Sequence, residues 1–167
     1  MFQITPRFQF MKLFTDNRPR AYARIHGDAD YPDLQGMVYF YDTPGGGVLV
    51  EAEIFGLPDF GRRGIPAFYG FHIHEKGDCS DRFQNAGGHY NPKNRMHPYH
   101  EGDMPPLFST DGYAWISFYN DTLELFDIIG KSVIIHRNAD DFTTQPSGNA
   151  GEMIGCGVIH LADERNI

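Results

Sequence analysis

The stretch Thr43-Pro-Gly-Gly-Gly-Val-Leu-Val-Glu-Ala-Glu-Ile-Phe55 joins a turn sequence to a strand sequence. Its proline and glycines favour a tight turn, because proline presets one backbone angle and glycine tolerates left-handed ones. Its second half places the acidic Glu51 and Glu53 between apolar neighbours. Alternation with a period of two is typical of a strand with one buried face. The stretch therefore predicts a β-strand at Val48–Phe55 that is entered from a turn.

The same alternation dominates the rest of the chain, and long helical patterns are missing from it. Further turn sequences lie at Gly61-Arg-Arg-Gly64 and Asp111-Gly112. The other candidate strands are Ala21–His26, Gly36–Asp42, Tyr69–His74, Tyr113–Tyr119, Ser132–His136 and Ile154–His160. About seven or eight short antiparallel strands with such turns predict an all-β fold, either a sandwich or a flattened barrel.

Two segments between the strands are too long for simple turns, Glu75–Thr110 and Arg137–Met153. Structureless segments of that length are uncommon in compact domains unless they are functional or held by something. We therefore expect two long functional loops. Residues 1–20 are interpreted as an N-terminal extension that precedes the regular pattern, and residues 21–167 as a single domain.

Composition excludes several classes of partner. The formal net charge is −8 with a pI of about 5.3, and no cluster of Lys and Arg offers a surface for nucleic acid. No apolar run approaches the roughly 20 residues that span a bilayer. Residues 1–20 do not read as a secretory signal, since Arg7 and Lys12 interrupt the apolar residues and no small-residue cleavage site follows. As written, the chain is expected in the cytoplasm, and outside it if a signal was removed before residue 1.

The chain has two cysteines, Cys79 and Cys156, which do not match a thiolate metal motif. Two alternatives stay open for them. They are two free buried thiols, or they form one disulfide that ties the first long segment to the last strand. By the chain-entropy argument, such a disulfide would stabilise the fold by roughly 4 kcal/mol, less any strain.

Metal-ligand spacing is the strongest functional signal in the chain. Two histidines at i and i+2 of a strand project from the same face, and a second cluster repeats ligand-type side chains at every third residue. The complete set is His72, His74, His89, His97, His100, Asp103 and His136. Each cluster taken separately could be surface histidines. Their joint occurrence predicts a metal centre, whereas His26 and His160 have no place in the pattern.

The number of ligands indicates two metal ions. Three nitrogens and one carboxylate fit tetrahedral zinc, and four nitrogens fit tetragonal Cu(II). Seven residues must then fill eight positions. Either one site keeps a water molecule, or one imidazole bridges both ions through its two ring nitrogens. His89 lies between the two clusters in the sequence and is the natural bridge.

With these residues, the chain resembles the copper/zinc superoxide dismutases over roughly residues 21–160. The matching segments are Gly70-Phe-His-Ile-His-Glu75, Gly87-Gly-His-Tyr-Asn-Pro92, His97 through Asp103, Val133-Ile-Ile-His136 with Ala139-Asp-Asp141, and Gly148-Asn-Ala-Gly151 followed by Cys156-Gly-Val-Ile159. The resemblance implies an antiparallel Greek-key β-sandwich or flattened barrel.

The resemblance also implies a role for each site residue. Copper would be bound by His72, His74, His89 and His136, and zinc by His89, His97, His100 and Asp103. His89 and His136 would be the catalytic residues. Asp140 would accept hydrogen bonds from His72 and His97, which fixes the orientation of ligand rings in metal sites. Cys79 and Cys156 stand where the family has its intrasubunit disulfide.

One position departs from the family pattern. Two residues after Gly148-Asn-Ala-Gly151 the family carries an arginine beside the copper, which guides the superoxide anion, and this chain has Glu152-Met153. That puts anion guidance in doubt, but not metal binding. Met153 is either a packing residue or a weak soft ligand for Cu(I). The residues that could supply positive potential in place of the arginine are Lys131, Arg137, Arg62 and Arg63.

The function that the resemblance implies is superoxide dismutation by Cu(II)/Cu(I) cycling with a structural zinc, superoxide being the substrate. The alternative is a copper/zinc-binding, dismutase-like protein with weak or no dismutase activity, which the missing arginine and the net charge of −8 favour. A third reading, an adhesive sandwich module with incidental histidines, does not explain the joint spacing. The oligomeric state stays open, a homodimer being one alternative.

Overall fold

The computed structural model describes residues 18–58, 64 and 67–163. Most of the expected N-terminal extension, and Arg62 and Arg63, therefore lie outside the described residues. Within them the chain forms one nine-stranded antiparallel sheet, a short 3-10 turn at Gln84–Ala86 and a short helix, α2. The elements are β1 (Ala21–Gly27), β2 (Gln35–Asp42), β3 (Val48–Phe55), β4 (Ala67–Tyr69), β5 (Phe71–His74), β6 (Leu107–Thr110), β7 (Tyr113–Asn120), α2 (Leu125–Ile128), β8 (Ser132–His136) and β9 (Met153–Leu161).

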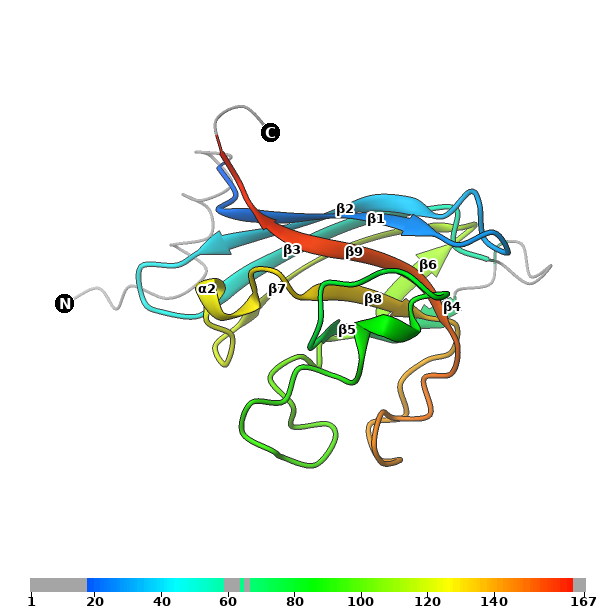
Figure 1. Cartoon of the computed structure of the whole chain (residues 1–167). Helices are drawn as coiled ribbons and strands as arrows, with labels where there is room; N and C mark the ends of the chain where they lie inside the picture. Colours follow the sequence, from blue (N-terminus) through cyan, green and yellow to red (C-terminus); the bar gives the residue numbers. More distant parts are fainter. Residues whose placement is uncertain (1–17, 59–63, 65–66, 164–167) are drawn as a thin grey trace.

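The sheet curls until its two ends meet. The strand order is β4-β6-β7-β3-β2-β1-β9-β8-β5, so that β4 and β5 stand at opposite ends of the sheet. In the chain, only Gly70 separates these two strands. One continuous segment therefore contributes to both ends, and the sheet closes into a flattened barrel (Figure 1). The all-β prediction is confirmed.

A Cβ atom at Gly70 would come within 2.9 Å of the Ala150 side chain and 3.2 Å of the His136 side chain. The backbone there also accepts a hydrogen bond from the His136 N–H and donates one to the Asn138 carbonyl oxygen. Glycine is required because the second long loop and the end of β8 approach this backbone closely. The residue that closes the barrel thus lies against the candidate site.

The predicted strand positions are confirmed to within a residue or two, with two differences. The segment Tyr69–His74 is divided between β4 and β5 at Gly70. The sequence does not predict the strand β6, whose residues fall within the expected first long loop. It has only four residues and follows Pro105-Pro106, so the alternation is too short to stand out beside a loop sequence. The one-turn helix α2 was not predicted either.

Alternation in the strands fills the barrel interior. On β3, Val48, Val50, Ala52 and Ile54 are buried, whereas Glu53 and Phe55 are exposed. Buried apolar side chains from every strand join them in one core. None of the helices among the described residues is long and apolar enough to cross a membrane.

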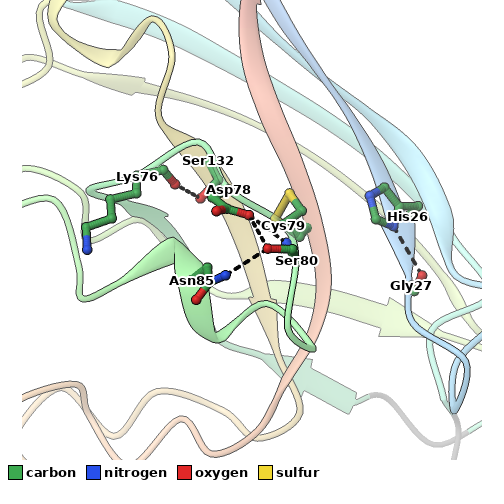
Figure 2. Close-up of a disulfide and its surroundings, with 9 residues drawn as sticks. His26, Gly27, Lys76, Asp78, Cys79, Ser80, Asn85 and Ser132 are labelled. Carbon is green, nitrogen blue, oxygen red and sulfur yellow. Dashed lines mark hydrogen bonds between the residues drawn. A yellow bond between two sulfur atoms is a disulfide. The ribbon is translucent and has the colours of Figure 1, made fainter.

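The two long loops hang from the same side of the barrel, beneath β5 and β8 (Figure 1). The first loop returns to β5, where the Ile73 N–H donates to the Gly102 carbonyl oxygen and the Tyr90 N–H donates to the Ile73 carbonyl oxygen, both at 2.8 Å. A disulfide joins Cys79 of this loop to Cys156 of β9, with 5.8 Å between their Cα atoms (Figure 2). The alternative of two free thiols is therefore wrong.

Candidate metal centre

All seven predicted ligand residues come together on the outside of the barrel, beneath the two loops. They form two groups, in each of which one potential ligand atom per residue lies within 4.8 Å of all the others. We call His72, His74, His89 and His136 the four-histidine group, and His89, His97, His100 and Asp103 the histidine–aspartate group. His89 belongs to both, as expected for a bridge between two ions.

The strands place most of the four-histidine group. His72 and His74 project from one face of β5, and His136 ends the neighbouring strand β8 at an irregularity in its pairing with β9. The Nε2 atoms of His74 and His136 face each other at 3.2 Å, although the two residues are 62 positions apart in the chain. Backbone bridges of His72 to Asp103 and of His74 to His89 bring the first loop alongside.

Hydrogen bonds on the far side of each ring select the nitrogen that faces inward. His74 Nδ1 lies 2.8 Å from the Gly87 carbonyl oxygen, and His136 Nδ1 lies 3.1 Å from the Gly151 carbonyl oxygen. A carbonyl only accepts, so both Nδ1 atoms donate, and the neutral rings keep free lone pairs on Nε2. His72 is held the other way, by its Nε2 atom, 2.7 Å from Asp140 Oδ2.

The histidine–aspartate group is built around one carboxylate. His89 Nδ1 lies 2.7 Å from Asp103 Oδ1, and the Nδ1 atoms of His97 and His100 lie 3.1 and 3.3 Å from Asp103 Oδ2. Burial raises the pKa of Asp103. Its hydrogen bond with His89 and the charges of the nearby histidines outweigh this effect, so the net pKa lies below its usual range. This arrangement gathers three nitrogens and one carboxylate oxygen, a donor set that suits a tetrahedral metal ion.

Unsatisfied ring nitrogens show that these residues fit metal ions. Four ring nitrogens are buried and form no hydrogen bond of good geometry, although those of His97 and His100 lie close to Asp103 Oδ2. They are His72 Nδ1, His89 Nε2, His97 Nδ1 and His100 Nδ1. Buried polar atoms in proteins nearly always have a partner, so orphaned ones call for an explanation such as an ion. Each of the four points into one of the two groups. A metal ion in each group would satisfy all of them.

Asp140 connects the two groups from behind. Its carboxylate accepts hydrogen bonds from His72 Nε2 at 2.7 Å and from His97 Nε2 at 2.9 Å, which are the two contacts that the resemblance implies. Burial raises the pKa of Asp140, but the hydrogen bonds from His72, from the Phe142 N–H and from His97 outweigh it and hold the pKa well below its usual range. The ionised carboxylate fixes both rings in the orientation that a ligand needs.

Burial keeps the rings of His72, His74 and His136 neutral. It lowers the pKa of His72 to about 4 and that of His136 to about 3, and the neighbouring histidines add to the effect. The pKa of His74 is also well below its ordinary value, for the same two reasons. At neutral pH these rings therefore carry no proton on the inward nitrogen and are ready to bind a metal.

We call Arg137, Glu152 and Met153, which lie next to His136 at the ends of β8 and β9, the rim of the four-histidine group. Among the residues that the structure describes, this rim has no free cation. Met153 packs against a small buried cluster beside the disulfide, in agreement with the packing alternative for this residue. The cluster consists of Phe83, Ala86, Ile134 and Cys156. Arg137 lies beside Glu152, with its Nη1 atom 3.7 Å from Oε2. Lys131 lies over the Tyr90 ring at 4.4 Å and precedes β8, at the end opposite His136.

Sequence reasoning assigned no role to three residues near the metal centre. The Gln145 side chain accepts a hydrogen bond from the His97 N–H at 3.0 Å and donates one to the His97 carbonyl oxygen at 2.7 Å. Gly148 packs so closely on Asp140 that a Cβ atom would fall 1.9 Å from Oδ1. Arg82 lines a hollow of about 230 Å3 with Met153 and Glu152, and forms ion pairs with Asp28 and Asp30. These contacts join distant segments, and no local spacing in the sequence signals them.

Comparison with known proteins gives a consistent result. A family model described as copper/zinc superoxide dismutase matches residues 34–159. A superoxide dismutase [Cu-Zn] of Legionella pneumophila is 36% identical over 145 residues, covering 82% of this chain and 85% of that protein. Among solved structures, the clock protein EA4 has a TM-score of 0.73 at 32% identity, covering 86% of this chain and 96% of that one. A SOD-like protein from Bacillus subtilis has a TM-score of 0.69 at 30% identity, covering 82% and 96%.

Proposed function

The chain belongs to the copper/zinc superoxide dismutase family, and we propose that it disproportionates superoxide to oxygen and hydrogen peroxide. In this proposal copper occupies the four-histidine group and zinc the histidine–aspartate group. The observation that carries it is the double membership of His89. Its Nδ1 atom faces Asp103 at 2.7 Å, while its Nε2 atom is buried in the other group without a partner. One imidazole can therefore serve two ions.

The donor sets support the assignment of the two metals. Four imidazole nitrogens suit Cu(II), and three nitrogens with one carboxylate suit zinc. A bound copper ion would supply the one-electron redox chemistry, which zinc lacks. The histidine–aspartate group then has a positional task. It holds His89 by its Nδ1 side, so that the Nε2 side stays directed into the four-histidine group.

Two superoxide ions and two protons give one oxygen and one hydrogen peroxide. His89 Nε2 is the atom that we assign to proton handling, because it is the nitrogen of the bridging ring that faces the four-histidine group. With copper bound, this nitrogen would hold a proton and pass it to the peroxide product. His136 keeps its orientation through the hydrogen bond from Nδ1 to the Gly151 carbonyl oxygen. Asp140 restrains His72 and His97 in the same way.

A second candidate function is copper and zinc binding with weak dismutase activity. It is favoured by one specific observation, the rim of the four-histidine group. Where the family carries an arginine, Met153 packs toward the disulfide, and the nearby Arg137 lies beside the carboxylate of Glu152. Superoxide is an anion, and an acidic protein needs local positive potential to attract it.

One sample can separate the two candidates. Copper and zinc per chain are measured by elemental analysis, and the rate of superoxide scavenging is measured on the same preparation, beside a His89→Ala variant as the control. A dismutase contains about one ion of each metal per chain and loses its rate in the variant. Full metal content with a scavenging rate equal to that of the variant would establish the binding protein instead. A metal-loaded structure with His72, His74 and His136 apart would refute the copper assignment.

A further inference from the structure

A second hollow, of about 290 Å3, lies between the first long loop and the end of β7. Its walls come from Arg95, Pro98, Tyr99, His100 and Asp103 on one side, and from Tyr119, Asn120, Asp121 and Thr122 on the other. His100 and Asp103 belong to the histidine–aspartate group, whereas no residue of the four-histidine group lines the hollow. The hollow therefore reaches one of the two groups and not the other.

Exposure of the ligand side chains follows the same division. The side chains of His100 and Asp103 are each 8% exposed, compared with 4% for His89 and 0% for His97. The two most accessible members of the group are thus the two that line the hollow. An ion that reaches this group from solvent meets His100 and Asp103 first.

The hollow also contains groups that suit a hydrated cation. His100 Nδ1 is buried and forms no hydrogen bond of good geometry. Asp121 is exposed at the outer edge, and its carboxylate forms no ion pair with the part of the chain that the structure describes. Arg95 is the positively charged residue among those that line the hollow, and its guanidinium lies 3.7 Å from the buried carboxylate of Glu101. A carboxylate outside and an imidazole with a second carboxylate inside are ligand types that suit zinc.

The wall formed by the end of β7 is fixed in place. Asn120 Oδ1 accepts hydrogen bonds from the Thr122 N–H and hydroxyl, both at 2.8 Å, and from the Leu123 N–H at 3.1 Å. The Tyr119 hydroxyl donates to the Gly46 carbonyl oxygen at 2.8 Å. The β7 wall of the hollow is therefore held in place from both sides.

We propose that this hollow is a separate entrance to the zinc group, through which the ion enters and leaves, and that Asp121 is the residue that first attracts it. The inference rests on the zinc assignment in the proposed function. It adds that zinc exchange does not pass through the rim of the four-histidine group. A negative charge at the mouth of a cleft raises the local concentration of a cation and its rate of entry.

The first experiment follows zinc uptake by the metal-free, disulfide-bonded protein after mixing with Zn²⁺. Asp121→Asn removes one charge without changing size, and Asp127→Asn, on the exposed side of α2, is the matched control with the same change in net charge. We expect uptake to slow roughly threefold in Asp121→Asn alone at low ionic strength, and the difference to fade with salt. Equal rates in the two variants would overturn the role of Asp121.

The second experiment blocks the hollow. Thr122→Trp places a large ring at its mouth, and Thr110→Trp adds the same ring on the outer face of β6 as the control. We expect Thr122→Trp to slow uptake, and to slow removal of zinc by a chelator by a similar factor, so that the equilibrium occupancy is unchanged. A ligand residue would change the occupancy instead. Uptake and removal at the control rates would overturn the entrance.

Co²⁺ separates this inference from the proposed function. Its absorption spectrum reports tetrahedral binding without copper and without any activity assay. If no variant binds Co²⁺ tetrahedrally, the unmodified chain included, the metal assignment itself fails. If Co²⁺ binds tetrahedrally and at the same rate in all variants and the unmodified chain, the metal assignment stands and the proposed entrance is refuted. Should Thr122→Trp not fold, the isosteric Asp121→Asn still decides whether the ion passes this mouth.

Discussion

Met153 is the register partner of His136 across strands β9 and β8. Met153, the position at which the resemblance implies an arginine, is thus backbone-paired with a histidine of the four-histidine group, yet its side chain packs against the cluster that contains Phe83 and Cys156. Position 153 therefore lies beside the site, but it carries no positive charge.

Met153→Arg is therefore expected to raise the rate of superoxide scavenging. The added cation would attract the anion, and the gain should shrink as salt screens it. Met153→Leu is the uncharged control and should leave the rate unchanged. Because the ligands are untouched, copper and zinc content should stay the same in both. A flat rate for Met153→Arg at low ionic strength would mean that another residue already guides the anion.

Glu152→Gln is expected to raise the rate as well, through Arg137. The Arg137 guanidinium lies 3.7 Å from the Glu152 carboxylate, and both side chains are about half exposed. Removing the carboxylate takes away one negative charge beside that cation, near the end of β8. Arg137→Ala in the Glu152→Gln background provides the test, since it should abolish the gain. If the gain persists without Arg137, the carboxylate acts by its own repulsion alone.

The local spacings that predicted the centre are those that secondary structure converts directly into geometry. His72 and His74 share a face because strand side chains alternate, and His100 and Asp103 are close because three residues make one turn. Asp140 was assigned only through the resemblance, since an acid in a loop has no distinctive local pattern. Contacts such as Gln145 with His97 depend on how two loops fold against each other, which no periodicity encodes.

The fold shows the same limit. Strands with several alternating residues, such as β3, were predicted because burial on one face imposes a period of two. The strand β6 has only two periods of alternation and a pair of prolines before it, so only its pairing with β4 and β7 defines it. Closure of the barrel at Gly70 follows from the order of the strands, which is a long-range property.

Asp140→Asn tests the connection between the two groups. Asparagine keeps the shape, but it can no longer accept a hydrogen bond on both sides, so either His72 or His97 is left facing an amide N–H₂. We expect metal affinity to fall by about 10- to 100-fold. Asp42→Asn, at the exposed end of β2, is a control for the loss of charge. Calorimetric titration with each metal measures the effect, and an affinity equal to that of the control would show that Asp140 does not orient the ligands.

Stability of the metal-free protein should fall as pH decreases from about 6.5 to about 4. Burial lowers the pKa of His72 to about 4 in the folded state, whereas an unfolded histidine titrates near 6.5. In this range the unfolded chain binds more protons than the folded one, so the free energy of unfolding decreases with decreasing pH. For His72 alone the loss is of order 3 kcal/mol by pH 4, and His74 and His136 add to it. Urea unfolding at several pH values measures this slope, and a flat profile between pH 7 and 5 would contradict the neutral, buried histidines.

The final prediction concerns what holds the first loop. Between Glu75 and Leu107 the described chain has one regular element, the 3-10 turn at Gln84–Ala86. The loop is tied instead at Cys79–Cys156, at the edge of β5 through Ile73, and around the Asp103 carboxylate. Reducing the disulfide or removing zinc should each speed hydrogen exchange across residues 79–103, and both treatments together should speed it most, because the remaining ties are few.

Amides of β2 and β3, which lie in the barrel away from the loop, are the internal control and should keep their protection. A Cys79→Ser, Cys156→Ser variant separates the loss of the disulfide from any effect of the reductant on bound metal. Exchange that stays unchanged in residues 79–103 after both treatments would show that backbone hydrogen bonds alone hold the loop.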